Sequence, residues 1–246
     1  MTRPKSRLKD YERKRRFAIT PEPRPKVTRR SARSGILQFV VQKHRASHLH
    51  YDFRLEWDGA LLSWAVPKGP SLDPETKRLA MAVEDHPLEY ADFEGIIPAG
   101  EYGGGTVMVW DQGTYVPDEP DVGKDWHQGE IKFTLQGRKL KGGWVLVRTG
   151  GATSRTWLLI KRRDAAAERG DSLLVRQPRS VVSKRLLAEI AFDEGGDVER
   201  AAAADPPDAI RALIRNPRTR RRVPHRTPAV WRSKSAGAST KRIGMS

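Results

Sequence analysis

A row of polar side chains within residues 49–56 has the composition of a metal-binding site. This segment alternates without a break between apolar and polar residues, as a strand with one buried face does. Its polar face would present His50, Asp52 and Arg54, with neighbouring side chains about 7 Å apart because a strand rises about 3.3 Å per residue. An imidazole and a carboxylate two positions apart can close on one cation. The row therefore predicts metal chemistry.

His44 lies just upstream of this row and is the candidate for a third ligand, provided that the intervening loop folds back. Three of the six histidines fall within residues 44–50, whereas a solvated strand face is usually built from Lys, Glu, Thr and Ser. We therefore favour a metal site over an ordinary amphipathic strand whose polar face meets solvent. Two imidazoles and one carboxylate suit Mn²⁺, Fe²⁺ or Zn²⁺, and the sequence does not choose among them.

Arg54 and His86 are the candidates for catalytic contacts with a phosphate. The planar fork of Arg54 can hold two oxygens of a phosphate, which favours phosphoryl chemistry. A histidine such as His86, with an ordinary pKa of about 6.5, can protonate a leaving oxygen or, when charged, stabilise a phosphate. Lys68 and Arg78 lie in or beside later loops and could face the same anion. Each of these three residues also has a plainer interpretation: His86 as a capping or surface histidine, Lys68 as a turn residue and Arg78 as a solvated arginine at the start of a strand.

Composition and charge limit the class of protein. Cysteine is absent, which excludes disulfides, thiolate metal sites and cysteine nucleophiles. No apolar run is long enough for a signal peptide or a membrane span, so we expect a cytoplasmic protein with no membrane partner. The net charge of +16 is concentrated at the ends, because residues 1–34 carry +10, residues 211–246 carry +11 and the remainder carries −5. Two basic arms of this kind indicate a nucleic-acid partner.

Strand-like segments dominate the middle of the chain. Short apolar or alternating runs occupy residues 36–42, 49–56, 60–66, 79–84, 106–110, 130–136, 143–149 and 156–161. The turn signals between them are Asp58-Gly59, Gln112-Gly113, Gln136-Gly137, Gly142-Gly143 and Gly150-Gly151. This pattern predicts a mainly β, antiparallel barrel or sandwich. The loops at 67–78, 85–104 and 115–129 are where we expect substrate contacts.

Four segments follow from this organisation. Residues 1–34 form a basic N-terminal arm, residues 35–165 the β domain, residues 166–216 a C-terminal helical extension and residues 217–246 a basic tail. We expect helices over 180–192 and 207–215. The tail has too little apolar surface to offset the entropy of ordering, which predicts disorder.

Four ordered blocks of sequence resemble a known family. They are Gln42-Lys43-His44, Leu49-His50-Tyr51-Asp52-Phe53-Arg54-Leu55, Ser63-Trp64-Ala65-Val66-Pro67-Lys68-Gly69-Pro70 and Glu84-Asp85-His86-Pro87-Leu88-Glu89-Tyr90. Together they closely resemble the 3′-phosphoesterase domain of bacterial DNA ligase D, over roughly residues 10–165. The resemblance implies a compact, closed antiparallel β-barrel of about eight strands with short flanking helices.

The resemblance also implies an activity. Members of this family depend on Mn²⁺, remove a 3′-terminal ribonucleoside and then the remaining 3′-phosphate, and act on DNA ends during nonhomologous end joining. The expected substrates are DNA 3′ ends or primer-templates that carry a 3′-ribonucleotide or a 3′-phosphate. A DNA ligase, a polymerase and the end-binding protein Ku are expected partners in trans.

The same resemblance assigns roles to individual residues. The metal ligands fall on His44, His50 and Asp52, and the phosphate contacts on Arg54 and His86. Further substrate-binding positions fall on Arg15, Glu22, Gln42, Lys68, Arg78 and Tyr90, and the N-terminal arm is expected to pack partly on the active site.

One position in the arm departs from the family. Arg16 stands where the family usually has Asp after the conserved arginine, which puts in doubt any arm contact made by that carboxylate. It leaves room for a second interpretation, a non-catalytic DNA-end binding module that recruits a ligase. A third is a non-haem Fe(II) oxygenase, whose facial triad also combines two histidines with a carboxylate.

Overall fold

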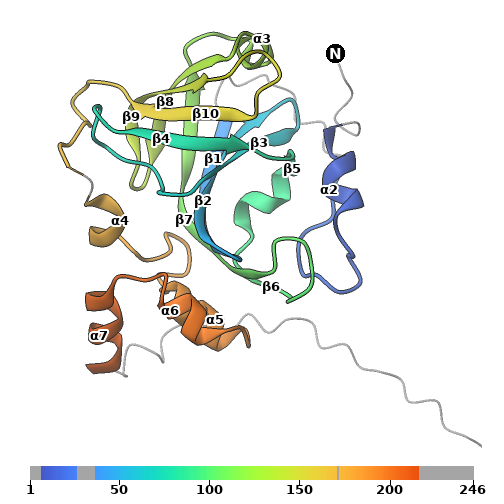
Figure 1. Cartoon of the computed structure of the whole chain (residues 1–246), viewed down its shortest axis with the longest axis vertical. Helices are drawn as coiled ribbons and strands as arrows, with labels where there is room; N and C mark the ends of the chain where they lie inside the picture. The colour runs from blue at the N-terminus through green and yellow to red at the C-terminus, as the bar shows by residue number, and fades with distance from the viewer. Residues whose placement is uncertain (1–6, 27–36, 171, 216–246) are drawn as a thin grey trace, which may run out of the picture.

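The chain forms a closed antiparallel β-barrel of eight strands, seen in a computed structural model that describes residues 7–26, 37–170 and 172–215 (Figure 1). The barrel strands are β1 (Leu37–Arg45), β2 (Leu49–Trp57), β3 (Ala60–Val66), β4 (Lys77–Ala82), β7 (Gly105–Pro117), β8 (Glu130–Gly137), β9 (Lys141–Arg148) and β10 (Thr156–Lys161). They run in the order β1-β2-β3-β4-β10-β9-β8-β7, and pairing of β7 with β1 closes the ring. Two short strands, β5 (His86–Pro87) and β6 (Gly95–Ile97), add to β3 and β7. The expected fold class is confirmed.

The two faces of the barrel wall differ in composition. Alternate residues of every strand point inward and form an apolar core, in which Trp64, Trp144 and Trp157 are fully buried. Because side chains alternate along a strand, Gln42 and His44 of β1 and the polar residues of β2 lie on the outer face. The row from His50 to Arg54 is therefore outside the barrel. A second, smaller apolar cluster covers part of this outer face.

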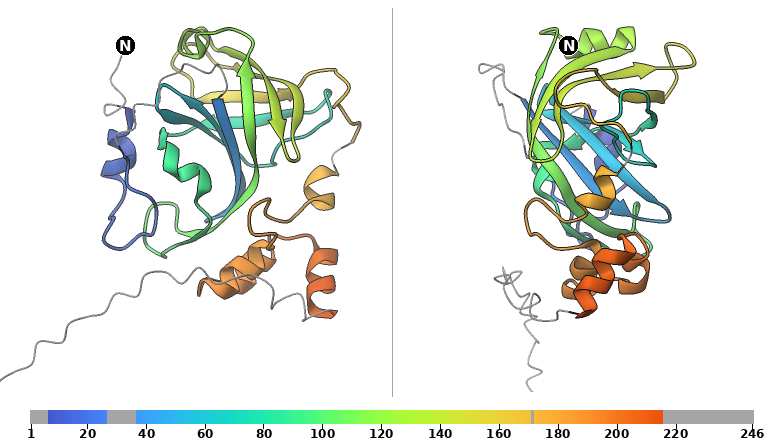
Figure 2. Two further views of the ribbon diagram at one scale, coloured as in Figure 1. Left: turned by 180° about the vertical axis from the view of Figure 1, so that it is seen from behind. Right: turned by 90° about the vertical axis from the view of Figure 1, so that its left-hand side faces the viewer.

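Short helices from three parts of the chain pack against the barrel. Helix α2 (Lys9–Arg13) belongs to the N-terminal arm and lies beside the 3₁₀ helix η1 (Leu88–Asp92), as Figures 1 and 2 show. Helices α5 (Leu187–Asp193), α6 (Val198–Ala202) and α7 (Pro207–Arg215) lie together below the end of β1 and β2. None of the helices in the described ranges is long and apolar enough to cross a membrane.

Two of the expected turns are wrong. Strand β7 continues through Gln112-Gly113, where Gly113 pairs with Gly137 across the sheet. A Cβ on Gly113 would lie 2.2 Å from the carbonyl oxygen of Gln136, so this glycine serves close strand contact and makes no turn. Gly142 has a φ of 74°, but it lies within β9. The turn at Asp58-Gly59 is confirmed, since both residues have positive φ and separate β2 from β3.

The helix predictions were partly correct. Helix α7 has the expected bounds, whereas the helix expected over 180–192 begins only at Leu187 and ends at Asp193. Helix α3 (Val122–Gln128) lies in a stretch expected to be a loop, and α4 (Leu173–Arg176) and α6 were not expected. The basic tail at 217–246 lies outside the described residues, and the segment boundaries stay predictions.

Candidate metal centre and phosphate site

Strands β1 and β2 bring the three predicted metal ligands together. In the antiparallel register His44 pairs with His50, and Asp52 pairs with Gln42 one step further along the same face. Nδ1 of His44 lies 3.5 Å, and Nε2 of His50 3.7 Å, from Oδ2 of Asp52. One ligand atom from each residue lies within 4.8 Å of the others. The loop at the hairpin tip thus folds back as the sequence required.

Backbone carbonyls orient both imidazole rings for metal binding. Nε2 of His44 donates to the carbonyl oxygen of Gly103 at 2.8 Å, and Nδ1 of His50 donates to that of His48 at 3.1 Å. Since a carbonyl only accepts, these nitrogens carry hydrogens, which leaves the other nitrogen of each ring as the one that a metal would bind. Both of these other nitrogens face Asp52. Metal-ligating histidines in proteins usually make such a hydrogen bond from the ring nitrogen that does not bind the metal.

Asp52 is ionised in this setting. Burial alone would raise the pKa of its carboxyl, but the positive charge of Arg54 and the interactions with His50 and His44 outweigh burial and hold that pKa well below its usual range. For His50, burial lowers the pKa, and the neighbouring carboxylate of Asp52 more than compensates. A deprotonated carboxylate between two imidazoles fits a divalent cation with mixed nitrogen and oxygen ligands.

Arg54 is held on all sides next to this cluster. Its Nη2 lies 3.1 Å from Asp52, its Nε donates to Oε1 of Gln42 at 2.8 Å, and its Nη1 donates to Oγ of Ser63 at 2.8 Å. The side chain is 2% exposed. Gln42 in turn donates from Nε2 to the carbonyl oxygens of Tyr90 and Phe93, both at 2.9 Å. The guanidinium is therefore fixed in position before a substrate arrives.

His86 is buried between two guanidinium groups. Its Nδ1 lies 2.9 Å from Nη1 of Arg54, and its Nε2 lies 3.1 Å from Nη2 of Arg15. Burial, together with the charges of Arg54 and Arg15, lowers the pKa of His86 well below its usual value. A protonated ring would donate from both nitrogens and would oppose both arginines. The imidazole is therefore neutral.

The N-terminal arm completes the wall around His86. Arg15 donates from Nε to Glu22 at 2.8 Å, and its Nη1 lies 3.3 Å from Glu84. Its guanidinium also stacks over the ring of Tyr11, 3.7 Å from the centroid. The structure thus places Arg15 and Glu22 beside His86, and their roles in substrate binding stay predictions.

Tyr90 lies against the same groups. Its ring centroid is 4.7 Å from that of His86, and the guanidinium carbon of Arg54 is 4.9 Å from it. Lys68 is exposed in the turn after β3, and Arg78 is buried on β4, where burial lowers the pKa of its guanidinium. Roles for Lys68 and Arg78 in substrate binding stay predictions.

Several residues of the site escaped the sequence analysis. Ser63 is the hydroxyl partner of Arg54, Glu84 holds Arg15 and Lys14, and the carbonyl of Gly103 orients His44. Ser63 lies in an otherwise apolar strand and gave no chemical signal on its own. Its place becomes visible only from the register that pairs it with Arg54.

Arg16 has a partner that the sequence did not suggest. Its guanidinium, 66% exposed, pairs with Glu101 in the glycine-rich loop after β6. Lys14 next to it contacts both Glu84 and Tyr102. The arm is thus attached at this position by an arginine on the arm and a carboxylate on the loop.

Comparisons with known proteins agree with this geometry. Residues 42–148 match the family model described as the DNA ligase D 3′-phosphoesterase domain. The multifunctional non-homologous end joining protein LigD of Pseudomonas aeruginosa (strain PAO1) is 53% identical over 185 residues, which are 73% of this chain and 22% of that protein. The multifunctional non-homologous end joining DNA repair protein LigD of Mycobacterium tuberculosis (strain H37Rv) is 48% identical over 145 residues, which are 59% and 19% of the two chains.

A third relative, LigD of Mycolicibacterium smegmatis, is 43% identical over 164 residues, which are 64% of this chain and 21% of that protein. The chain thus spans about a fifth of the length of these relatives. The match covers β2 and β3 completely and includes all three residues of the metal cluster, together with Arg54 and His86. Residues 42–148 of the chain are therefore identified as a DNA ligase D 3′-phosphoesterase domain.

Proposed function

We propose that this protein is a metal-dependent phosphoesterase that processes DNA 3′ ends. One observation supports this most strongly: two imidazoles that each turn one nitrogen toward a single ionised carboxylate stand beside a fixed guanidinium. The cluster combines the ligands of a divalent transition metal with a phosphate-binding cation, which is the equipment that phosphoryl transfer needs. The expected order is removal of a 3′-terminal ribonucleoside, followed by removal of the 3′-phosphate that remains.

His44, His50 and Asp52 would hold the metal, which we take to be Mn²⁺ from the family resemblance. When bound, the metal supplies a Lewis acid for a phosphate oxygen. The donor atoms fit it, because the two ring hydrogens are already committed to carbonyls and the carboxylate is ionised. Mn²⁺, Fe²⁺ and Zn²⁺ all suit this donor set.

Arg54 offers a phosphate less than its full fork. Its Nε is occupied by Gln42, and its Nη1 faces both Ser63 and Nδ1 of His86, while Nη2 uses one of two hydrogens on Asp52. A single hydrogen bond from Nη2 to a phosphate oxygen therefore fits better than the two-oxygen grip expected from the sequence. The charge of Arg54 would stabilise the transition state from a fixed position.

His86 acts as a neutral group in this proposal. In the hydrolysis, water adds to phosphorus, the bond from phosphorus to the leaving oxygen breaks, and that oxygen takes a proton. Because the pKa of His86 is lowered by burial and two arginines, solvent is a better source of this proton than the imidazole. We assign His86 the role of spacing Arg15 and Arg54 around the phosphate.

The biological setting follows from the relatives. Proteins named for non-homologous end joining carry the matching domain, so we propose that this chain repairs 3′ ends before joining. A ligase, a polymerase and Ku would act with it. The positive charge at the two ends of the chain would supply general affinity for DNA.

The test uses a labelled primer-template with one 3′-terminal ribonucleotide, incubated with and without Mn²⁺ and resolved on a gel. We expect conversion to a 3′-phosphate and then to a 3′-hydroxyl only with the metal. Asp52→Asn should lower turnover by more than about a hundredfold, since loss of an outer partner alone costs about ten- to hundredfold in metal affinity or activity. Calorimetric titration with Mn²⁺ should show a matching loss of metal binding.

The control is Asp118→Asn, which changes a partly exposed carboxylate on the loop after β7. It should keep both activity and metal binding. If the protein binds the duplex but leaves its 3′ end unprocessed, the protein is a DNA-end binding module and the proposal of an enzyme fails. Near-normal turnover of Asp52→Asn with Mn²⁺ would refute the ligand assignment.

A further inference from the structure

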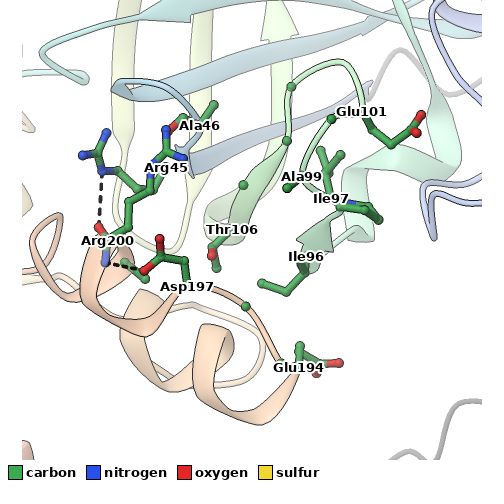
Figure 3. A pocket seen from close by; sticks show the side chains of 18 of the residues that line it. Arg45, Ala46, Ile96, Ile97, Ala99, Glu101, Thr106, Glu194, Asp197 and Arg200 are labelled. Carbon is green, nitrogen blue, oxygen red and sulfur yellow. Dashed lines mark hydrogen bonds between the residues drawn. The ribbon is translucent and has the colours of Figure 1, made fainter.

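A large pocket lies at the tip of the β1–β2 hairpin. Its volume is about 890 Å³, and its walls are the hairpin tip at 45–47, strand β6 with its following loop, and residues 194–201 from the C-terminal extension (Figure 3). Neither the family resemblance nor the proposed chemistry uses this pocket. Part of its wall, residues 194–201, lies beyond the 42–148 family match.

The pocket adjoins the metal cluster. Gly103 lines it, and the carbonyl of Gly103 accepts the hydrogen bond from His44. Arg45, which follows His44 in the chain, lines it as well. A nucleic-acid strand whose terminal phosphate lies at the cluster would therefore have its next nucleotide within reach of this pocket.

The carboxylates that line the pocket are already satisfied. Each has a partner: Glu101 pairs with Arg16, Glu194 lies 3.3 Å from Arg185, and Asp197 caps α6 by accepting from the backbone nitrogen of Arg200 at 2.9 Å. Their negative charge is thus offset locally by a cation or by a helix terminus.

Two arginines in the same wall have no such compensation. Arg45 donates only to carbonyl oxygens, from Nε to Arg200 at 3.3 Å and from Nη1 to Ser47 at 3.0 Å. Arg200 donates from Nη2 to the carbonyl oxygen of Ala46. Neither makes an ion pair with any residue that the structure describes. Carbonyls orient the two guanidiniums and leave their charge available, which suits an anion.

The opposite wall is apolar apart from Glu101, which is paired with Arg16. Pro98 borders the pocket together with Ile96 and Ile97, the two isoleucines labelled in Figure 3. A pocket that joins two uncompensated arginines to apolar side chains suits a nucleotide, which combines a phosphodiester with a flat base.

We propose that this pocket binds the nucleic-acid strand at the nucleotide next to the processed 3′ end. Arg45 and Arg200 donate to the phosphodiester, and the base lies against the apolar wall. The C-terminal extension thereby takes part in substrate recognition through Arg200. This inference rests on the proposed function, because it names where the strand continues from the metal cluster.

The test compares two substrates that differ only in chain length. Both a nucleoside 3′-monophosphate and a short oligonucleotide with a 3′-phosphate present the same terminal group, but only the oligonucleotide has a phosphodiester for the pocket. We expect Arg200→Gln and Arg45→Gln to lower the ratio of kcat/KM for the oligonucleotide to that for the monophosphate by about tenfold, the size of one charge-assisted hydrogen bond. Arg200→Lys should restore part of the ratio.

Arg169→Gln is the matched control, because it removes the same charge at an exposed position of the described chain. It should leave the ratio at the wild-type value. Equal losses on both substrates, or a ratio no lower than that of Arg169→Gln, would overturn the proposal. Melting temperatures of all variants exclude unfolding as the cause.

A second readout separates this inference from the proposed function. Binding of the fluorescent oligonucleotide is measured by anisotropy in metal-free buffer over a range of salt. Removing one phosphate contact should reduce the slope of log K against log salt by about one relative to Arg169→Gln. If the wild type binds the oligonucleotide but processes neither substrate, the proposed function fails. The salt slope still shows whether the pocket binds the phosphodiester. An unchanged slope refutes it.

Discussion

Arg54 owes its position to a hydroxyl that contributes no charge. Ser63 accepts from Nη1 of Arg54 at 2.8 Å and itself donates to the carbonyl oxygen of Leu61 at 2.9 Å. The hydroxyl thus ties the guanidinium to the backbone of β3. A cation that must sit opposite a developing charge gains from such fixing, because it needs no rearrangement during the reaction.

Ser63→Ala should therefore lower kcat by about tenfold, in line with the loss of one hydrogen bond to a charged group, while KM changes little. The melting temperature should fall only slightly, since the change removes a single atom. Steady-state kinetics with a 3′-phosphate substrate measure this effect. Ser71→Ala, at another buried serine, outside the site, should leave kcat unchanged. A kcat within twofold of wild type for Ser63→Ala would show that Arg54 needs no support from this hydroxyl.

At the residue scale the sequence predicted the metal ligands and Arg54 but missed several groups that hold them in position. The alternation in residues 49–56 was enough to place His50, Asp52 and Arg54 on one face, because strand period alone determines it. The partners Ser63 and Gly103 depend on how β3 and the loop after β6 lie against β1 and β2. No local pattern encodes such long-range register.

Glu84 is the carboxylate that holds two cations of the N-terminal arm at once, beside the pairs of Arg16 with Glu101 and Arg7 with Asp85. Glu84 lies 3.0 Å from Nζ of Lys14 and 3.3 Å from Nη1 of Arg15. Burial would raise the pKa of Glu84, but the hydrogen bond from Lys14 and the charges of Arg15 and Lys14 outweigh it, so the pKa lies below its ordinary value of 4.5. The attachment therefore depends on pH in the acid range.

A depressed carboxyl pKa stabilises the docked arm above the ordinary value of 4.5, and this stabilisation is lost as pH falls through the lowered pKa. We expect amide hydrogen exchange in residues 7–26 to accelerate in that range before the barrel strands do. Glu84→Gln should exchange rapidly in the arm already at neutral pH. Equal protection of the arm in wild type and Glu84→Gln at pH 7 would show that this carboxylate does not hold it.

The C-terminal extension is attached to β1 by a buried ion pair. Nζ of Lys43 lies 2.7 Å from Oδ1 of Asp205, with side-chain exposures of 2% and 0%, and Oδ2 of Asp205 accepts from the backbone nitrogen of Ala188 at 2.9 Å. Burial lowers the pKa of Lys43, against the raising effect of Asp205. The lysine is the neighbour of the ligand His44.

Asp205→Asn should destabilise the protein by about 3–5 kcal/mol, because it leaves the ammonium of Lys43 buried without a counter-charge. Urea unfolding followed by tryptophan fluorescence measures this loss. Asp208→Asn, at a carboxylate that is 87% exposed, should cost almost nothing. The double variant Lys43→Met, Asp205→Leu should recover much of the stability. A loss below about 1 kcal/mol for Asp205→Asn would contradict the importance of the pair.

At the element scale, turn signals proved less reliable than strand runs. Gly113 and Gly142 look like turn residues in isolation, yet both lie within strands where the close approach of another chain segment or a local positive φ requires glycine. Helix α3 begins at an Asp121 cap inside a polar segment that is too short to show helical periodicity. The alternating strands were predictable because each needs only its own sequence to define a face.

On the scale of the whole molecule, the barrel and the site use opposite sides of the same strands. The apolar side forms the closed core, and the polar side forms the metal cluster. The family resemblance identified the barrel and the ligands together, but it ended near residue 165. The contacts of Asp205 and Arg200 with the hairpin of β1 and β2 lay beyond its reach.

The ion pair between Lys43 and Asp205 can form only late during synthesis, because its two residues lie far apart in the chain. The hairpin with all three metal ligands emerges early from the ribosome, since a chain is made from its N-terminus. Asp205, the counter-charge of Lys43 in this hairpin, emerges only after β10, the last barrel strand, is complete. A nascent chain that has finished its barrel therefore already carries every ligand, but keeps the lysine beside His44 uncompensated until the C-terminal helices arrive.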